Sequence, residues 1–465
     1  MNFDDKIPAG AIRIIEELNA AGFEAYIVGG CVRDLVLGRT PNDWDITTSA
    51  LPMQVKSVFK RTVDTGIKHG TVTVLMRMNG RQESFEVTTY RIDGEYDDCR
   101  HPRQVEFTAS LEEDLKRRDF TVNAMAYAPG KGIVDMHGGL EDLDRRLIRC
   151  VGNATERFTE DALRMMRAIR FSAQFDADIE EETWNAILKL APNIRFVSAE
   201  RIRVEMEKLL LSDHPYRFKM FYESTLTKYF LPEWEQTMIT TQENPHHMYS
   251  VGEHLLHSLE TVNTQLLKEE FGDEAYPRVL KLMRLTMLFH DIAKPLLKKV
   301  DDDGVAHFHG HPELGAKMAE EILRRLKYDN DTVKNVVRLI KNHEDRYPAQ
   351  EKALRHEMNR CGEECFPLLF YVQEADCLAQ SMFMRDEKLE RIGKLRELYR
   401  VILEKKQCVS IKDLAVKGKD LMEAGVNPGP DMGRILQEML DDVLEEPDHN
   451  DRQYLLERYV YEKKA

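Results

Sequence analysis

The stretch VGGCVRDLVLGRTPNDWDIT, residues 28–47, joins two glycines to a short helical pattern and then to two aspartates separated by one tryptophan. The residues AYIV up to the glycines have the composition of a strand, so the pair marks a turn from strand into helix. Glycine lets a ligand approach the backbone, and the free N–H groups of a helix N-terminus attract anions. Gly29, Gly30 and Arg33 are therefore predicted to cradle a triphosphate, although a glycine pair alone is more often a simple tight turn.

Asp43 and Asp45 lie two residues apart, a spacing that places both carboxylates on one face if DWDIT is a strand. Two like charges this close repel each other unless a cation lies between them, and Mg²⁺ accepts carboxylate ligands together with phosphate oxygens. Glu86, in the strand pattern SFEVTTYR (84–91), is a candidate third acid. Two metal ions on three acids can activate a hydroxyl and stabilise a leaving pyrophosphate. Two aspartates at this spacing are more often part of a solvated strand face, and Glu86 alone is equally typical of an exposed strand residue. The pairing of the glycine turn with Asp43 and Asp45, with Arg33 between them, is much more specific than either part.

The organisation of the chain predicts one small mixed domain followed by helical modules. Strand-like alternation recurs in TVTVLMRM (71–78), and from about residue 140 onward almost every segment has helical spacing. The segment RIDGEYDDCRHPRQ (91–104) has no periodicity and is predicted to be a polar loop. The predicted fold class is α+β, with a β-sheet head followed by all-α neck, body and tail modules.

Composition restricts the classes of function. The chain has 465 residues and a formal net charge of −15, which argues against a surface coated by nucleic acid but permits a local basic groove. Seven scattered cysteines without a CxxC pair are typical of reduced thiols in a cytoplasmic protein. No apolar run approaches the length of a membrane span, and the N-terminus has no signal-peptide pattern, so a membrane partner is not expected.

Several ordered motifs resemble the CCA-adding tRNA nucleotidyltransferases, and within them the bacterial class II enzymes. They are GGCVRD with DWD, HGTVTV (69–74), LKRRDFTVNAMAY (115–127) and RFTEDALRMMRAIRF (157–171), and the resemblance covers about residues 23–215. It implies stepwise addition of C, C and A to tRNA 3′ ends from CTP and ATP, with Mg²⁺ and without a nucleic-acid template; no DNA partner is expected. Carried over, it assigns metal binding to Asp43 and Asp45, the third acid to Glu86, and nucleotide binding to Gly30, Arg33, Arg118, Asp161, Arg164, Arg167 and Arg170.

The last four of these residues repeat every three positions, so on a helix they would wind slowly across one side. Cytosine and adenine each present an amino group beside a ring-nitrogen acceptor, which Asp161 and Arg164 can bind. Uracil and guanine present a carbonyl and an N–H at these two positions, so neither hydrogen bond can form. Each unpaired buried partner costs about 1–3 kcal/mol. The pair would thus select C and A over U and G. Without the other motifs, a solvated helix face with acid–base pairs is the commoner reading.

Two further details refine the resemblance. Asp119 and Asn123 near Arg118 are interpreted as residues that cap or brace a helix, and Arg118 as a phosphate clamp. The loop 91–104 matches the segment that in this family helps to switch from C to A addition, which argues against an enzyme that adds only C.

A second group of motifs, HHMYSVGEHLLHSLE, LFHDIAKP, NHEDR and QEADCLAQ, resembles the HD phosphohydrolase domain. Imidazole and carboxylate ligands suit Mn, Fe, Ni or Co, and bridging metals can activate water to attack a phosphate ester. A histidine-containing helical domain without metal is the alternative. The resemblance assigns metal ligation to His254, His290, Asp291, His311, His343 and Asp376.

The remaining helical segments are predicted to hold tRNA. RIRVEMEKLLLSDHP (201–215) has helical spacing, and a helix is expected to start at about Pro430 after a turn. Lys417 and Lys419 precede that turn and are tentative RNA contacts, with a plain helix hairpin as the equal alternative. The predicted domains are a catalytic head (1–140), a nucleotide-reading neck (141–175), an RNA-binding body (176–245), an HD domain (246–376) and a tRNA-binding tail (377–465).

Three alternatives to full CCA addition stay open. One is an A-adding enzyme that needs a partner to supply CC. Another is a poly(A) polymerase, which the absence of a basic tail makes less favoured. The third is an HD phosphohydrolase whose head only binds RNA.

Overall fold

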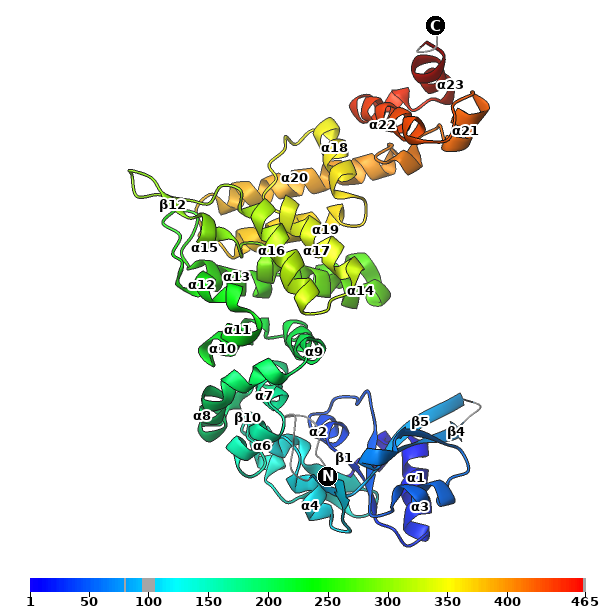
Figure 1. Cartoon of the computed structure of the whole chain (residues 1–465), viewed down its shortest axis with the longest axis vertical. Helices are drawn as coiled ribbons and strands as arrows, with labels where there is room; N and C mark the ends of the chain where they lie inside the picture. Colours follow the sequence, from blue (N-terminus) through cyan, green and yellow to red (C-terminus); the bar gives the residue numbers. More distant parts are fainter. Residues whose placement is uncertain (79–80, 94–104, 463–465) are drawn as a thin grey trace. The chain divides into compact units, whose positions relative to one another are not determined.

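The computed structural model describes residues 1–78, 81–93 and 105–462, and it divides into two compact units, Met1–Pro232 and Glu233–Ala465. The fold is α+β, with a mixed sheet near the N-terminus followed by helices, as predicted (Figure 1). None of the helices in the described part of the chain combines the length and the apolarity that a membrane crossing requires.

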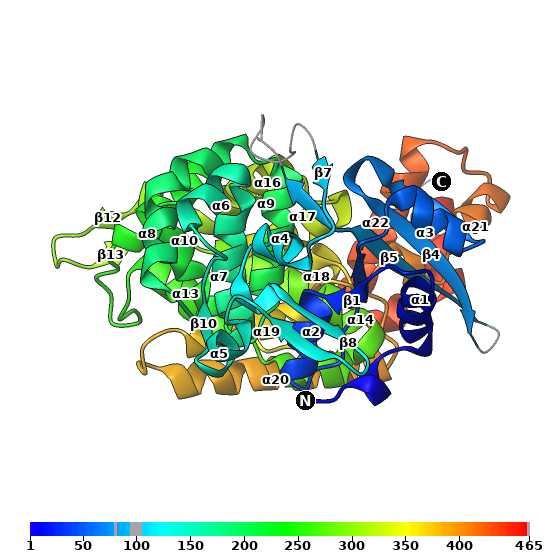
Figure 2. The same cartoon turned by 90° about the horizontal axis from the view of Figure 1, so that it is seen from below.

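The first unit is built on a seven-stranded sheet with the order β3-β4-β5-β2-β1-β8-β9. Neighbouring strands are antiparallel except β2 and β5, which run parallel at the centre. The long hairpin of β4 and β5 is visible in both views (Figure 1, Figure 2). The strands are β1 (Ala25–Val28), β2 (Asp45–Thr48), β3 (Thr62–Gly66), β4 (Thr71–Met78), β5 (Arg81–Thr89), β8 (Met125–Ala128) and β9 (Gly132–Asp135).

Alternation along β1 divides the core of this unit. Ile27 belongs to the larger apolar cluster with residues of α1 and α3, whereas Tyr26 and Val28 belong to a second cluster on the other face of the sheet. The helices of the unit are α1 (Ala9–Ala20), α2 (Gly30–Val36), α3 (Pro52–Val58), α4 (Leu111–Lys116), α5 (Gly139–Asp144), α6 (Ala154–Glu160), α7 (Leu163–Phe175), α8 (Glu181–Leu190), α9 (Ala199–Leu210), α10 (Lys219–Glu223) and α11 (Thr227–Phe230).

Two short ribbons complete the first unit, and one of them corrects a prediction. β6 (Arg91–Asp93) pairs with β7 (Val105–Phe107), so the start of the predicted loop 91–104 is a strand, and residues 94–104 lie outside the described residues. The three-residue strand is too short for its alternation to be recognised in the sequence. β10 (Leu147–Ile148) pairs in parallel with β11 (Asp178–Ile179).

The second unit is helical apart from the small ribbon of β12 (Lys299–Val300) and β13 (Ala306–His307). Its long helix α14 is two helices joined at Gly272, which has a φ of 73° that favours glycine. The helices are α12 (Glu235–Ile239), α13 (Val251–Glu260), α14 (Thr264–Phe289), α15 (Lys294–Leu297), α16 (His311–Arg325), α17 (Asn330–Asn342), α18 (Glu351–Cys361), α19 (Phe366–Leu378), α20 (Arg385–Glu404), α21 (Gly418–Glu423), α22 (Pro430–Glu445) and α23 (Arg452–Leu456).

Candidate active site and candidate metal centre

The parallel pairing of β2 and β5 brings two of the predicted acids together. Asp45, the first residue of β2, lies directly opposite Glu86 in the register of the two strands. Asp43 precedes the strand, so the prediction that both aspartates lie on one strand face is wrong for Asp43: β2 begins two residues later than expected. The three acids nevertheless influence one another, because burial and then Asp45 and Asp43 raise the pKa of Glu86.

The glycine turn and Arg118 lie beside these acids. Gly29 has a φ of 81°, and a Cβ there would lie 3.0 Å from Nη1 of Arg118, so this position requires glycine on both counts. Burial raises the pKa of Asp45, the charge of Arg118 opposes that rise, and Asp43 adds to it. The guanidinium of Arg118 is held in turn by the fully buried Asp114, with 3.3 Å between Nη2 and Oδ2.

A chain of side chains connects α2 with α7. Arg33 Nη1 donates to Asn123 Oδ1 at 2.6 Å, and Asn123 Nδ2 donates to Asp119 Oδ1 at 3.1 Å. Arg167 donates to the other oxygen of Asp119 through Nη2 at 2.6 Å and Nε at 2.8 Å. The guanidinium of Arg33 also lies 4.7 Å from the ring centre of Phe175. Asp119 and Asn123 therefore brace the region around Arg33, as the sequence predicts.

The residues predicted to read the base are divided between two elements. Asp161 ends α6 and precedes α7, with φ −140° and ψ 104°, so the prediction that it shares one helix with the three arginines is wrong. Its Oδ1 accepts from the backbone N–H of Leu163, the first residue of α7, at 3.0 Å, and its Oδ2 accepts from Arg201 at 2.6 Å. Arg164 is the second residue of α7 and binds Glu160 at 2.7 Å.

α9 holds the other two arginines of α7. Arg170 donates to Glu205 at 2.5 Å, and Arg167 lies 4.0 Å from the same carboxylate. Burial lowers the pKa of Arg170 despite this partner, whereas the pKa of Arg167 is raised because Asp119 and Glu205 outweigh the burial. Both guanidiniums are therefore set in place by carboxylates that belong to other elements.

A cavity of about 830 Å³ in the first unit collects most of the predicted nucleotide site. Its size lies in the range of small-molecule and cofactor sites. Glu86, Asp161 and Arg164 are not among its lining residues in this structure. The predicted residues that line it are Gly29, Gly30, Arg33, Asp43, Asp45, Arg118, Arg167 and Arg170.

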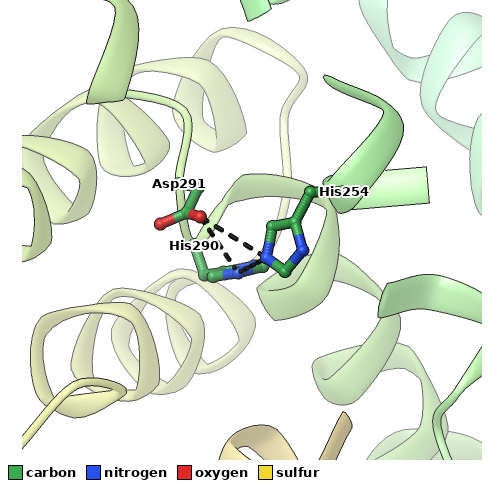
Figure 3. Close-up of side chains that lie close together, drawn as sticks. All are labelled: His254, His290 and Asp291. Atoms are coloured by element: carbon green, nitrogen blue, oxygen red, sulfur yellow. Dashed lines mark hydrogen bonds and ion pairs between the residues drawn. The ribbon is translucent and has the colours of Figure 1, made fainter. Parts of the chain in front are cut away.

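In the second unit, five helices or their ends bring the six predicted HD ligands to one buried point. Figure 3 shows His254, His290 and Asp291 pointing toward one another. His254 Nε2 lies 2.9 Å from Oδ1 of Asp376 and 3.2 Å from Nε2 of His290. Asp291 also belongs to a second group of ligand atoms with His311 and His343, so it is shared between the two groups.

The four imidazoles of this cluster are oriented by backbone carbonyl groups. Their Nδ1 atoms lie 2.6–3.4 Å from the carbonyl oxygens of Ala379, Met287, Phe308 and Ile340. A ring that donates from Nδ1 presents the lone pair of Nε2, and all four Nε2 atoms point into the cluster. Histidine ligands of metals are usually held in this way, so the residues fit a metal ion.

The charges of the cluster also suit a cation. Burial alone would raise the pKa of Asp291, but Lys294 and the surrounding imidazoles hold it well below its usual range. Burial and then His290 lower the pKa of His343 to about 3, which keeps that ring neutral and able to bind a metal. Among the described residues, the acids of the first unit form no such compact group of three ligand atoms.

Three family profiles match successive parts of the chain, namely the Poly A polymerase head domain (residues 25–149), the RNA and SrmB-binding site of polymerase A (176–238) and tRNA nucleotidyltransferase domain 2 (306–458). The CCA-adding enzyme of Streptococcus thermophilus is 34% identical over 447 residues, which are 96% of this chain and 95% of that relative. The chain belongs to the CCA-adding enzyme family.

Other members of the family match a smaller or larger part of the chain. The CCA-adding enzyme of Leuconostoc mesenteroides is 56% identical over 198 residues, which are 43% of this chain, and in that match the chain spans only 48% of the relative's length. A crystal structure of the Bacillus stearothermophilus CCA-adding enzyme in complex with CTP matches 98% of both chains at 30% identity, with a TM-score of 0.69.

Sequence reasoning about this family member missed several residues that support the two sites. Asp114 holds Arg118, and the acid–base spacing in LEEDLKRRD was a usable signal for it. Arg201 and Glu205 reach Asp161 and Arg170 from α9, a contact over 35 residues or more that no local pattern indicates. In the second unit, Lys294 lies 2.6 Å from Asp291 and follows it by one helical turn in HDIAK.

Proposed function

We propose that the chain adds C, C and A in turn to the 3′ ends of tRNA, with CTP and ATP as substrates and pyrophosphate as the second product. The single observation that carries this proposal is the register of β2 with β5. It sets Asp45 opposite Glu86 beside a cavity whose lining includes the glycine turn and Arg118. Membership of the CCA-adding enzyme family supports the same activity.

We assign the phosphates of the incoming nucleotide to the glycine turn and the arginines of the cavity. Backbone N–H groups at Gly29 and Gly30 and the guanidinium of Arg118 are suited to a triphosphate. Asp43, Asp45 and Glu86 would hold Mg²⁺. Burial first, and then the charges of Asp45 and Asp43, raise the pKa of Glu86, and a cation would relieve the repulsion among the three acids. When bound, Mg²⁺ supplies charge stabilisation of the reacting phosphate and of the leaving pyrophosphate.

The predicted domain roles follow from this proposal. Residues 1–140 would carry the chemistry, 141–175 would read the nucleotide, 176–245 would contact RNA, and 377–465 would hold tRNA through its shape. Lys417 and Lys419 remain tentative contacts in the last segment: Lys417 precedes α21, and the side chain of Lys419 is 83% exposed beside Glu423.

The proposal is tested with transcripts of one tRNA that end at the discriminator base, at C and at CC. Each is incubated with the purified chain, Mg²⁺ and the four nucleotides singly and together, and the product ends are sequenced. Completion to CCA on all three transcripts is the expected result. A single A on the CC-ended transcript alone would instead identify an A-adding enzyme, and long A tracts a poly(A) polymerase.

Base selection provides a first prediction. Replacing Asp161 with alanine removes the acceptor for the amino group of the base, and we expect discrimination of CTP against UTP to fall roughly 10- to 100-fold, because each unmade buried bond costs about 1–3 kcal/mol. The measurement is the ratio of kcat/KM for the two nucleotides on a tRNA that lacks CCA. Glu156→Ala, an exposed acid on α6, is the matched control and should keep the ratio. An unchanged ratio in Asp161→Ala would remove Asp161 from base selection.

A second candidate function, hydrolysis of phosphate esters, is favoured by the carbonyl-oriented histidine cluster of the second unit. Its imidazole and carboxylate donors suit Mn, Fe, Ni or Co. Two ligand groups that share Asp291 are the arrangement expected of a bridged pair of ions, which when bound would activate water. Lys294 lies close enough to contact a phosphate brought to that centre.

Metal binding by this cluster is the second prediction. The purified chain, loaded with Mn, Fe, Ni or Co and desalted, should retain up to two ions per chain by elemental analysis. The double variant His290→Ala, Asp291→Ala should retain none, because it removes ligands from both groups. His309→Ala, an exposed histidine on the segment before α16, should bind metal like the parent chain. A parent chain that retains no transition metal would end the phosphohydrolase proposal without affecting CCA addition.

A further inference from the structure

A groove in the second unit is lined by residues of α16, α17 and α18. These three helices are labelled in Figure 1. The volume of the groove is about 590 Å³, and it lies outside the histidine cluster. Five cationic side chains line it against a single acid, Glu320, in a chain whose net charge is −15. The cations are Arg324, Lys334, Arg338, Lys341 and Arg360.

Two of these cations are already neutralised. Arg324 pairs with Glu320 at 2.8 Å, and Arg360 pairs with Glu357 at 2.5 Å and also with Asp345. Side chains paired in this way contribute little free positive charge to the groove. Its electrostatic character therefore depends on the other three cations.

Lys334, Arg338 and Lys341 have no carboxylate within ion-pairing distance in residues 1–78, 81–93 and 105–462. All three belong to α17, where they are spaced by four and then three residues. At 100° and 1.5 Å per residue they form one stripe about 10 Å long. Like charges at these spacings repel one another, and an anion laid along the stripe relieves that repulsion.

The guanidinium of Arg338 lies beside the end of α18 and is hydrogen-bonded to the thiol of Cys365. Burial raises the pKa of that thiol, so this partner is neutral and leaves the charge of Arg338 uncompensated. Gly362, with a φ of 81°, ends α18 beside the guanidinium, and a Cβ at that position would lie 2.7 Å from Nη1 of Arg338. The absence of a side chain therefore lets the guanidinium lie against the backbone at the edge of the groove. Val333 and Val337 form an apolar part of the lining between the cations.

We propose that this groove binds the phosphodiester backbone of tRNA, an inference that rests on the proposed function for the identity of the polyanion. A row of spaced, unpaired cations on one helix face is the pattern expected for successive phosphates. An isolated phosphate would use one or two of the cations and leave the rest of the stripe unpaired. Contacts of this kind position the RNA and read no sequence, which suits an enzyme that accepts every tRNA.

The test compares the full chain with the double variant Lys334→Ala, Lys341→Ala. Both side chains are exposed and unpaired, so the variant should keep its fold and its circular dichroism spectrum. Binding of a fluorescent tRNA transcript is measured by anisotropy over a series of salt concentrations. We expect the affinity to fall roughly tenfold and the slope of log K against log salt to decrease by about 1.5, as two phosphate contacts are lost.

A matched control and a kinetic measurement define the outcomes. Lys299→Ala, Lys406→Ala removes the same charge from two exposed lysines outside the groove and should bind tRNA like the parent chain. Like the groove lysines, these two have no carboxylate within ion-pairing distance among the described residues. In the groove variant the KM for tRNA should rise, while kcat and the KM for CTP stay unchanged. Equal tRNA affinity in the groove variant and the parent chain would overturn the inference.

Two further results distinguish a failure of the groove proposal from a failure of the proposed CCA addition. A parent chain that binds no tRNA and adds no nucleotide would contradict the proposed function itself. Binding of ATP and of pyrophosphate to the groove is measured through changes in the NMR signals of α17. If these ligands shift the signals in the parent chain but not in the groove variant, while tRNA affinity is equal in the two proteins, the groove instead binds a small phosphorylated ligand.

Discussion

Replacing Asp45 with asparagine is expected to reduce the rate of CTP incorporation into tRNA about 10³-fold or more. The change keeps the size of the side chain and removes one of the three charges predicted to hold Mg²⁺. Loss of one preorganised electrostatic contact to a reacting phosphate or oxyanion typically has an effect of this size. Because Asp45 is the first residue of β2 and lines the cavity, outside the apolar clusters of the sheet, the fold should be unaffected.

The measurement is single-turnover incorporation at saturating tRNA and CTP, across a series of Mg²⁺ concentrations. Asp64→Asn, which alters an exposed aspartate of β3 paired with Lys56, provides the control and should retain the full rate. Glu86→Gln should be impaired less severely, because Glu86 does not line the cavity. A full rate in Asp45→Asn would contradict the assignment of the metal site to the centre of the sheet.

Replacing Asp119 with alanine is expected to lower the free energy of unfolding of the first unit by about 1–3 kcal/mol. The change leaves the buried amide of Asn123 without its acceptor and leaves the half-buried Arg167 with only Glu205 as an acid partner, at 4.0 Å. Asp119 is 8% exposed and receives two hydrogen bonds from Arg167 and one from Asn123. Since Asn123 in turn orients Arg33, nucleotide binding should weaken in the same variant. Urea unfolding followed by circular dichroism, with CTP binding measured in parallel, tests both effects.

The same residue gives the stability a defined pH dependence. Burial alone would raise the pKa of Asp119, but Arg167 and Asn123 lower it far below its ordinary value. A depressed pKa in the folded state stabilises the fold above the pKa of the unfolded state, near about 4, and that contribution is lost as the pH falls further. The stability difference between the parent chain and Asp119→Asn should therefore narrow below about pH 4. Asp178→Asn, in which the side chain is 89% exposed, should show no such narrowing.

Much of the first unit follows from local patterns. The strand before the glycine turn, the helix after it and the strands β4 and β5 depend on patterns close together in sequence, and all four were predicted. The pairing of β4 with β5 in a hairpin was not predicted. Asp161 was misplaced because a repeat of three continues across the junction of α6 and α7. The short break between the two helices leaves no trace in the sequence pattern. It nevertheless places Asp161 outside α7 and directs its carboxylate to Arg201.

The residues missed by the sequence are those whose partners lie far away along the chain. Glu205 acts on Arg170 from a different helix, and the groove on α17 depends on Gly362 at the end of α18. The histidine cluster could be anticipated only through its resemblance to known motifs, because its ligands come from several elements between α13 and α19. The carbonyl groups that orient its rings belong to the backbone and have no signature in composition.

The parallel pairing of β2 with β5 affects the order in which the sheet of the N-terminal head can fold during synthesis. The hairpin of β4 and β5 joins neighbouring segments, whereas β2 and β5 are about forty residues apart. Closing so long a loop is slow relative to forming a hairpin. During synthesis, the contact cannot form until β5 has left the ribosome. Asp45 and Glu86 therefore come to face each other only after β5 has joined β2, so the site proposed for the nucleotide is incomplete in a nascent or half-folded head.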